Sequence, residues 1–183
     1  MSLYVALLRG INVGGKNLIK MMDLRTCFED GGYEQVATYI QSGNVLFRSG
    51  RKQTALTRGI EEMLAARFDY QASVVVRSQR QMQQIVERAP KGFGTQPAKY
   101  RYDVLFLKDS LKASTAIESV PTKPGVDAAY AGSGVLYFSR LISKASQSRL
   151  SKIVSLPMYQ QLTIRNWNTT TKLSAMMQAH HQG

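Results

Sequence analysis

The chain has 183 residues, of which 44% are hydrophobic, and 24 Lys and Arg against 12 Asp and Glu give it a net charge of +12. That length suits one globular domain or two small ones, and the composition allows an ordinary core. The single cysteine, Cys27, excludes an internal disulfide. No apolar run is long enough to cross a membrane, and no signal-type segment precedes the first strand. We therefore expect a cytoplasmic protein in which Cys27 is a buried side chain.

The positive charge is concentrated in the second half of the chain. Residues 1–78 carry ten Lys and Arg and seven Asp and Glu, whereas residues 79–183 carry fourteen and five, a net charge of +9. No acidic residue follows Asp127. This half should attract phosphate groups, although a basic surface that only keeps the protein in solution fits the same pattern.

The first half predicts a complete βαββαβ unit. An apolar strand is expected over residues 3–9, a helix over 20–31 and a second helix over 54–68, from the spacing of their hydrophobic residues. Strands rich in β-branched side chains are expected at 36–40, 45–47 and 72–76. This order is that of a ferredoxin-like plait, and we place the first domain at residues 1–77.

The same order recurs in residues 78–183, after a linker helix at 78–89 and a loop at 90–101. The expected elements are a strand at 104–107, a helix at 110–119, a hairpin of 128–131 and 135–138, a helix at 146–155, a strand at 161–165 and a last helix from about 169. The two hairpins share similar letters, Ser42–Phe47 and Ser133–Phe138, about ninety residues apart. We therefore predict an α+β fold of two tandem ferredoxin-like plaits that arose by internal duplication.

A glycine-rich loop between the first strand and the first helix is the first candidate site. It combines glycines, which allow close approach of a ligand, with cationic and amide side chains: Arg9, Gly10, Asn12, Gly14, Gly15, Lys16 and Asn17. The spacing from Gly10 to Lys16 is that of a phosphate-binding loop, but Asn17 stands where Ser or Thr would reach magnesium. An anion site of another kind and a purely structural turn both remain open.

The turn between the second and third strands should lie beside this loop. In a βαββαβ plait the loop after strand one and the hairpin after strand two are at the same end of the sheet. Ser42 and Asn44 would then add polar groups to the rim of a pocket. The alternative is that Ser-Gly-Asn is simply a favourable sequence for a tight turn.

A second candidate site joins the last strand to the last helix. Its residues are Arg165, Asn166, Trp167 and Asn168, with Arg149 upstream in the same basic half. Asn168 or Thr169 is the expected helix N-cap, and Trp167 would anchor the turn by burial. The functional reading is that Arg165 and Asn166 bind a phosphate, carboxylate or base edge while Trp167 stacks on the ligand.

Two groups of residues resemble an uncharacterised bacterial family, domain of unknown function 1697. They are Ala6–Asn17, Met22–Arg25 and Thr38–Val45 near the N-terminus, and Ser148–Leu150 with Thr163–Thr169 near the C-terminus. The resemblance covers nearly the whole chain and implies a fold of two plait-like halves. It implies no activity.

Catalytic chemistry is weakly indicated. His180 and His181 lie in the last four residues, and no Cys and His cluster suggests a metal site. Strand aromatics such as Tyr102 and Tyr137 fit either a base-stacking platform or a core. We expect binding of a nucleotide, phosphorylated metabolite or nucleic acid through residues 10–17 and the basic half, with the cofactor unknown. An enzyme for a small anionic substrate at that loop and a basic protein-interaction module are the alternatives.

Overall fold

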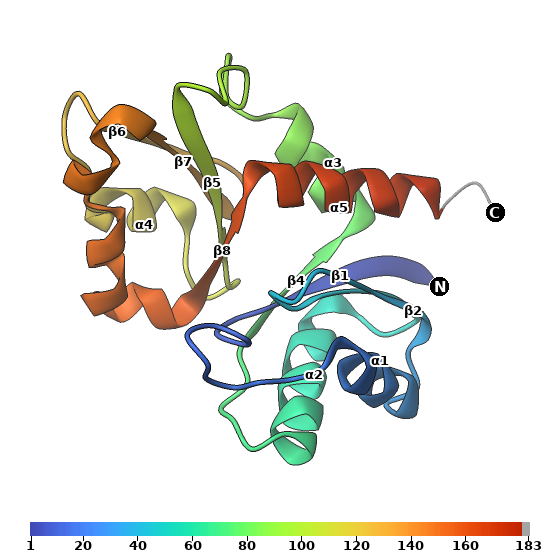
Figure 1. Cartoon of the computed structure of the whole chain (residues 1–183). Coiled ribbons are helices and arrows are strands. Elements are labelled where there is room, and N and C mark those ends of the chain that lie inside the picture. Colours follow the sequence, from blue (N-terminus) through green and yellow to red (C-terminus); the bar gives the residue numbers. More distant parts are fainter. Residues whose placement is uncertain (181–183) are drawn as a thin grey trace. The chain divides into compact units, whose positions relative to one another are not determined.

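A computed structural model describes residues 1–180, so that His181 lies outside it. The chain forms two compact units (Figure 1). The first contains residues 1–82 together with the chain from Leu173 onward, and the second contains residues 83–172. Each unit has one four-stranded antiparallel sheet, so the fold is of the mixed α+β class, as the sequence predicted.

The first unit follows the predicted element order. Its elements are β1 (Ser2–Leu8), α1 (Met21–Asp30), β2 (Glu34–Tyr39), β3 (Asn44–Ser49), α2 (Gln53–Arg67) and β4 (Val74–Ser78). The strands lie in the order β2-β3-β1-β4, with β1 between β3 and β4. The predicted bounds of every one of these elements are correct to within a few residues. The strongly periodic apolar positions explain that agreement.

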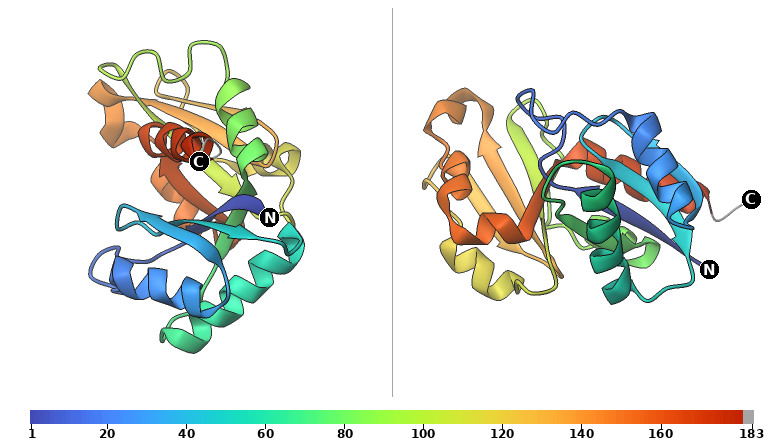
Figure 2. Two further views of the ribbon diagram at one scale, coloured as in Figure 1. Left: turned by 90° about the vertical axis from the view of Figure 1, so that its right-hand side faces the viewer. Right: turned by 90° about the horizontal axis from the view of Figure 1, so that it is seen from below.

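The core of the first unit lies between its sheet and two helices, α1 and α2, which cover one sheet face (Figure 2). Alternate residues of β1 face these helices, namely Tyr4, Ala6 and Leu8. Cys27 of α1 is buried in this core, and burial raises the pKa of its thiol. The predicted burial of Cys27 is therefore confirmed, and a raised pKa disfavours the reactive thiolate.

The second sheet is built in the same order as the first. After α3 (Gln79–Glu87) come β5 (Tyr100–Leu107), α4 (Ala113–Ser119), β6 (Asp127–Ala131), β7 (Val135–Leu141) and β8 (Leu162–Asn166). They form an antiparallel sheet of order β6-β7-β5-β8. Strand β5 begins four residues earlier than predicted, since the alternating Tyr100–Asp103 segment also pairs with β7.

The helix predicted over residues 146–155 is wrong. Three short 3-10 helices stand in that region: η1 (Ile142–Gln147), η2 (Leu150–Ser155) and η3 (Pro157–Gln161). Serine side chains form hydrogen bonds with the local backbone here. For example, the N–H of Leu150 donates to Ser148 Oγ. Such bonds compete with the backbone hydrogen bonds of an α-helix. Pro157 prevents continuation of a helix from the preceding residues. The apolar periodicity was nevertheless informative, because Leu150 and Ile153 are buried in the second core.

The last helix also differs from its prediction. Helix α5 (Trp167–Ala179) begins at Trp167, and its cap is Asn166, whose Oδ1 accepts the N–H of Thr169 at 2.8 Å. The expected cap at Asn168 or Thr169 is therefore corrected. The predicted second domain held the whole helix, whereas its residues from Leu173 group with the first unit. There Leu173 and Met177 are fully buried, and Gln79 Nε2 donates to the Met177 carbonyl at 2.8 Å.

Candidate functional site

The glycine-rich loop of the first unit is folded on itself as a small hairpin. The N–H of Asn12 donates to Asn17 O and the N–H of Lys16 donates to Val13 O, both at 3.1 Å. Gly14 and Gly15 form the tip with φ of +58° and +73°. Two consecutive positive φ values are those of a two-residue hairpin turn, which explains the glycine pair without a ligand.

The amide side chains of this loop hold it in place. Asn12 Nδ2 donates to Ile19 O at 3.0 Å and to Gln41 O at 2.8 Å, and its Oδ1 accepts the N–H of Ile19 at 2.8 Å. Asn17 Nδ2 donates to Gly10 O at 2.8 Å. The bond to Gln41 confirms that the loop lies beside the turn after β2. In these contacts both asparagines act as structural residues.

The neighbouring turn is likewise held by its polar residues. Asn44 is fully buried, and its Nδ2 donates to Tyr39 O at 2.8 Å and to Ser42 Oγ at 3.1 Å. Gly43 has φ of +84°, and a Cβ at this position would lie 2.6 Å from Ile11 Cδ1. The loop and the turn are thus packed closely together.

The charged side chains of the loop are placed differently from each other. Lys16 is exposed, as predicted, while Arg9 is half-buried and its N–H donates to Ser73 O. The apolar side chains near the tip are also in solvent, with Val13 65% and Leu18 76% exposed. Binding of an anion by this loop stays a prediction.

The second candidate segment lines a pocket of about 370 Å³ in the second unit. Asn166, Trp167 and Asn168 form the wall at the start of α5. The other walls come from the loop before β5, from β5 itself and from β7. The residues they contribute are Gly94, Pro97, Tyr100, Arg101, Tyr102, Asp103 and Arg140. Three residues predicted from the sequence therefore lie in one concave site.

Phe93 fixes the aromatic part of this pocket. Its ring makes edge contacts with Tyr102 at 4.8 Å, Trp167 at 5.1 Å and Tyr137 at 5.3 Å between centroids. Gly94 follows with φ of +82°, and a Cβ there would overlap Trp167 Nε1. Trp167 is half-buried in these contacts while it also lines the pocket.

Two charged residues lie side by side in the pocket wall. Arg140 Nη2 is 3.8 Å from Asp103 Oδ2, and 26% and 14% of the two side chains are exposed. Burial raises the pKa of the Asp103 carboxyl, and the guanidinium groups of Arg140 and Arg101 offset part of that rise. The first N–H groups of α5 add the positive end of a helix dipole to the same wall.

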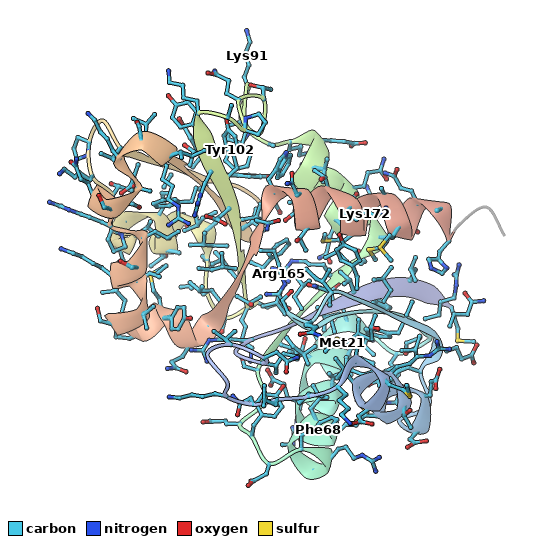
Figure 3. All side chains as sticks on the ribbon, in the orientation of Figure 1. Met21, Phe68, Lys91, Tyr102, Arg165 and Lys172 are labelled. Atoms are coloured by element: carbon cyan, nitrogen blue, oxygen red, sulfur yellow. The ribbon has the colours of Figure 1, made fainter. Side chains whose placement is uncertain are left out.

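A second pocket, of about 250 Å³, shares Tyr100 and Tyr102 with the first. It extends along the loop before β5 and is also lined by Lys91, Phe93 and Tyr130. Figure 3 labels Tyr102 on β5 and Lys91, which projects from that loop. The two tyrosines, on alternate residues of β5, thus separate two neighbouring hollows.

Arg149 and Arg165 are outside the walls of these two pockets. Arg149 is exposed, and its N–H donates to Asp127 Oδ2 at 2.9 Å. Arg165 is buried and donates to Thr163 Oγ1 and Ile164 O, both at 2.9 Å. Burial lowers the pKa of Arg165 to about 10. A ligand-binding role for either residue stays a prediction.

Comparison with known proteins agrees with this architecture. Residues 1–137 match the model of a family described as protein of unknown function, DUF1697. The chain belongs to this family. The suspected resemblance is therefore confirmed for the N-terminal signature, while the second signature lies beyond the matched residues. Among curated proteins, none matches the chain.

A solved structure of similar fold is that of the conserved bacterial protein SP0830 from Streptococcus pneumoniae. It shares 30% sequence identity with this chain at a TM-score of 0.84, and the match covers 97% of this chain and 99% of that one. The likeness therefore extends beyond residue 137, where the match to the family model ends. The description of SP0830 names no activity, so the function of the DUF1697 site has to be argued from its residues.

Sequence reasoning missed six residues of the site: Gly94, Pro97, Tyr100, Arg101, Asp103 and Arg140. The signal for three of them was the alternation Tyr100-Arg101-Tyr102-Asp103, which in a strand puts tyrosines on one face and charges on the other. Arg140 could not be found this way, because it reaches the site only through its pairing with Arg101 in the β5–β7 register. Gly94 is recognisable only from its contact with Trp167.

The described residues limit the chemistry that is available to the protein. Within residues 1–180, no cluster of three or more His, Cys, Asp or Glu side chains could hold a metal ion. In the same part of the chain, no helix has both the length and the apolar character needed to span a membrane. The pocket beside Asp103 therefore offers guanidinium groups, amides, a carboxylate and aromatic rings as its binding groups.

Proposed function

We propose that this protein binds a phosphate-bearing ligand, a nucleotide or a nucleic acid, in the pocket between β5 and the start of α5. The observation that carries the proposal is the composition of that pocket. It unites two guanidinium groups with the aromatic surfaces of Tyr102 and Trp167. Guanidinium groups bind phosphate oxygens in a bidentate manner, and aromatic side chains stack on bases.

The charge of the second unit supports the same proposal. Residues 83–172 carry thirteen Lys and Arg and five Asp and Glu, a net charge of +8. Such a field raises the local concentration of anionic ligands and speeds their association. The glycine-rich loop of the first unit is the competing location, since Lys16 and the Gly14–Gly15 tip are exposed there.

We also infer that each sheet with its helices is a ferredoxin-like plait, and that the two plaits arose by duplication. Both sheets are antiparallel, and the order β2-β3-β1-β4 corresponds strand by strand to β6-β7-β5-β8. In both, the first strand of the unit is a central one. The 3-10 helices of the second unit then occupy the place of α2 in the first.

The test uses the sole tryptophan of the chain as its probe. Because Trp167 lines the pocket, a bound ligand should change its fluorescence. Wild-type protein is titrated with nucleoside monophosphates, inorganic phosphate and an eight-nucleotide single-stranded RNA at several salt concentrations. Binding of the RNA should weaken steeply with salt, by about 0.7 log units per log unit of salt for each phosphate contact. Binding of a free nucleotide should depend less on the salt concentration.

Three single variants then locate the site. Arg140→Ala removes a charge from the pocket, Lys16→Ala removes one from the loop, and Lys144→Ala removes an exposed charge of the second unit as the matched control. Arg140→Ala should weaken binding about 10- to 100-fold, the range for a hydrogen bond to a charged group. The two lysine variants should change the affinity less than about twofold, because salt screens the attraction between the ligand and a distant surface charge. A larger effect of Lys16→Ala would move the site to the loop, and no binding by wild type would overturn the proposal.

A further inference from the structure

The charged pair in the pocket leaves two buried polar atoms without a hydrogen bond. Among residues 1–180, neither Asp103 Oδ2 nor Arg140 Nε has a hydrogen-bond partner. The distance of 3.8 Å between Asp103 Oδ2 and Arg140 Nη2 is too long for a hydrogen bond. Buried polar atoms are almost always hydrogen-bonded, so an unused acceptor beside an unused donor needs an explanation.

The register of the sheet places these two side chains together. Arg140 pairs with Arg101 across β5 and β7, and Asp103 pairs with Phe138 on one side and Asn166 on the other. Beyond Asn166 strand β8 gives way to α5, so β5 is unpaired along this edge at Arg101. The pocket opens at that place, with the carboxylate and the guanidinium in its wall.

The pair defines which group a ligand must present. An ionised carboxylate only accepts hydrogen bonds, and a guanidinium only donates them. A ligand that satisfies both needs an acceptor next to N–H donors on one edge. A carboxylate is best matched by two adjacent N–H groups, because it accepts them in a bidentate manner.

Guanine is the common nucleobase with that edge. Its Watson–Crick edge presents, in order, the O6 acceptor, the N1–H donor and the N2 amino donor. Adenine presents an amino donor beside the N1 acceptor, and cytosine an amino donor beside the N3 acceptor. Uracil has a single N–H between two carbonyl oxygens. Only guanine gives a carboxylate two neighbouring donors and a guanidinium an acceptor next to them.

The rest of the pocket suits a flat ring. Tyr102 and Trp167 both line the pocket, and the ring of each makes an edge contact with Phe93. Its volume of about 370 Å³ lies within the range of small-ligand sites. Arg101, on the same strand, is available for the phosphate.

We propose that Asp103 and Arg140 read the Watson–Crick edge of guanine, so that the pocket selects guanine nucleotides or guanine in a single strand. This inference rests on the proposed function, since it specifies the ligand of the same site. Asp103 would accept N1–H and the N2 amino group, and Arg140 would donate to O6.

Selectivity among four monophosphates tests the proposal by Trp167 fluorescence. Wild type should bind guanosine monophosphate at least about tenfold more tightly than adenosine monophosphate, the discrimination expected of one bidentate base contact. Inosine monophosphate keeps O6 and N1–H but lacks the amino group, and should have intermediate affinity. Xanthosine monophosphate has a carbonyl at that position, which repels a carboxylate, and should bind weakly.

The decisive variant is Asp103→Asn, which has the same shape but donates through its amide. It should lose the guanine preference and bind xanthosine monophosphate several-fold more tightly than wild type does, because its N–H can donate to the xanthine O2. Asp109→Asn, at an exposed acid just after β5, is the matched control and should leave the preference unchanged. Thermal unfolding of each variant confirms that it is folded.

Two further titrations distinguish a free nucleotide from a single strand as the source of the guanine. A U-rich RNA octamer with one central G is compared with the same octamer carrying one A, and both with guanosine monophosphate. Tighter binding of the G octamer than of the nucleotide would assign a single strand as the ligand. Comparable affinities would assign the free nucleotide.

The outcomes distinguish this inference from the proposed function. Equal affinities of wild type for the four monophosphates, or a guanine preference that survives Asp103→Asn, would overturn guanine recognition while binding in the pocket stood. If no nucleotide or RNA changes the fluorescence or the unfolding temperature, the proposed function and the inference both fall.

Discussion

The glycine-rich loop of the first unit and the pocket of the second unit contain similar polar side chains but use them differently. In the loop, the asparagine amides bind the backbone of the loop and of the neighbouring turn. In the pocket, polar atoms of Asp103 and Arg140 are buried within the described chain without a hydrogen bond. A satisfied amide stabilises a fold, whereas an unsatisfied buried donor or acceptor costs stability.

The glycines of the loop and of the pocket also differ in what they face. Gly14 and Gly15 supply positive φ at an open hairpin tip, where nothing lies within 4 Å of a Cβ. Gly94 instead lies against Trp167, and a side chain there would displace a wall of the pocket. A glycine-rich sequence alone therefore does not distinguish a turn from a binding surface, because the two uses depend on what the glycine faces.

The largest effect is expected from Gly43→Ala, which tests how firmly the loop is packed on the turn. The new Cβ would lie 2.6 Å from Ile11 Cδ1 and 2.9 Å from Leu8 Cβ at a φ of +84°. Overpacking and left-handed strain together should cost about 3–4 kcal/mol of unfolding free energy. Gly15→Ala, at an open position of similar φ, is the control and should cost about 1 kcal/mol. Urea unfolding measures both, and equal costs would mean that the loop is not tightly docked.

Trp167→Ala should affect both stability and binding, because this residue anchors the turn and lines the pocket. Loss of its packing on Phe93 and Gly94 should cost about 3 kcal/mol, near the lower limit for a large aromatic residue since Trp167 is only half-buried. Trp167→Phe should restore most of the stability. Nucleotide binding by both variants is followed by calorimetry, since the fluorescent probe is absent. Unchanged binding by a folded Trp167→Ala variant would make the residue an anchor alone.

The strands and helices that bury apolar residues were predictable because their apolar positions recur with a regular period along the sequence. Helix α2 is an example: Leu56, Ile60 and Leu64 recur at four-residue spacing and are all fully buried. Leu150 and Ile153 also lie at helical spacing and are buried, yet serine side chains and Pro157 divert the backbone between Ile142 and Gln161 into 3-10 helices. Periodicity reports which side chains are buried and leaves the hydrogen-bond pattern of the backbone open.

The candidate site was only partly predictable, for a related reason. The segment around Trp167 stood out because a cap and an anchor need fewer residues than it has. Asp103 and Arg140 meet only through the pairing of β5 with β7, 37 positions apart in the chain, and nothing in either local sequence indicates that register. The amides of Asn12 and Asn17 were expected to face a ligand, whereas backbone carbonyls within reach bind them.

Asn12→Ala tests the structural role of the loop amides. The variant loses three hydrogen bonds, to Ile19 O, Gln41 O and the Ile19 N–H, and places alanine at a φ of +53°. We expect a loss of about 2 kcal/mol in unfolding free energy, because two of these backbone groups are part-buried. Asn17→Ala loses one exposed bond and should cost about 1 kcal/mol. If instead Asn12→Ala kept its stability and lost nucleotide binding, the loop would be the ligand site.

The smallest effect is expected in the pH dependence of stability that arises from Asp103. Burial raises the pKa of this carboxyl in the folded protein, so folding favours its protonated form. Its contribution to stability is therefore fully present below the pKa of the unfolded chain and is lost as the pH rises through the folded pKa. Asp103→Asn stays neutral throughout, so the stability of the variant relative to wild type should increase as the pH rises above about 4, the pKa of an unfolded-state aspartate. Urea unfolding of both proteins and of Asp109→Asn at each pH measures this difference. A relative stability that falls with rising pH would mean that Arg140 and Arg101 outweigh burial, and that the carboxylate is already satisfied by its neighbours without a ligand.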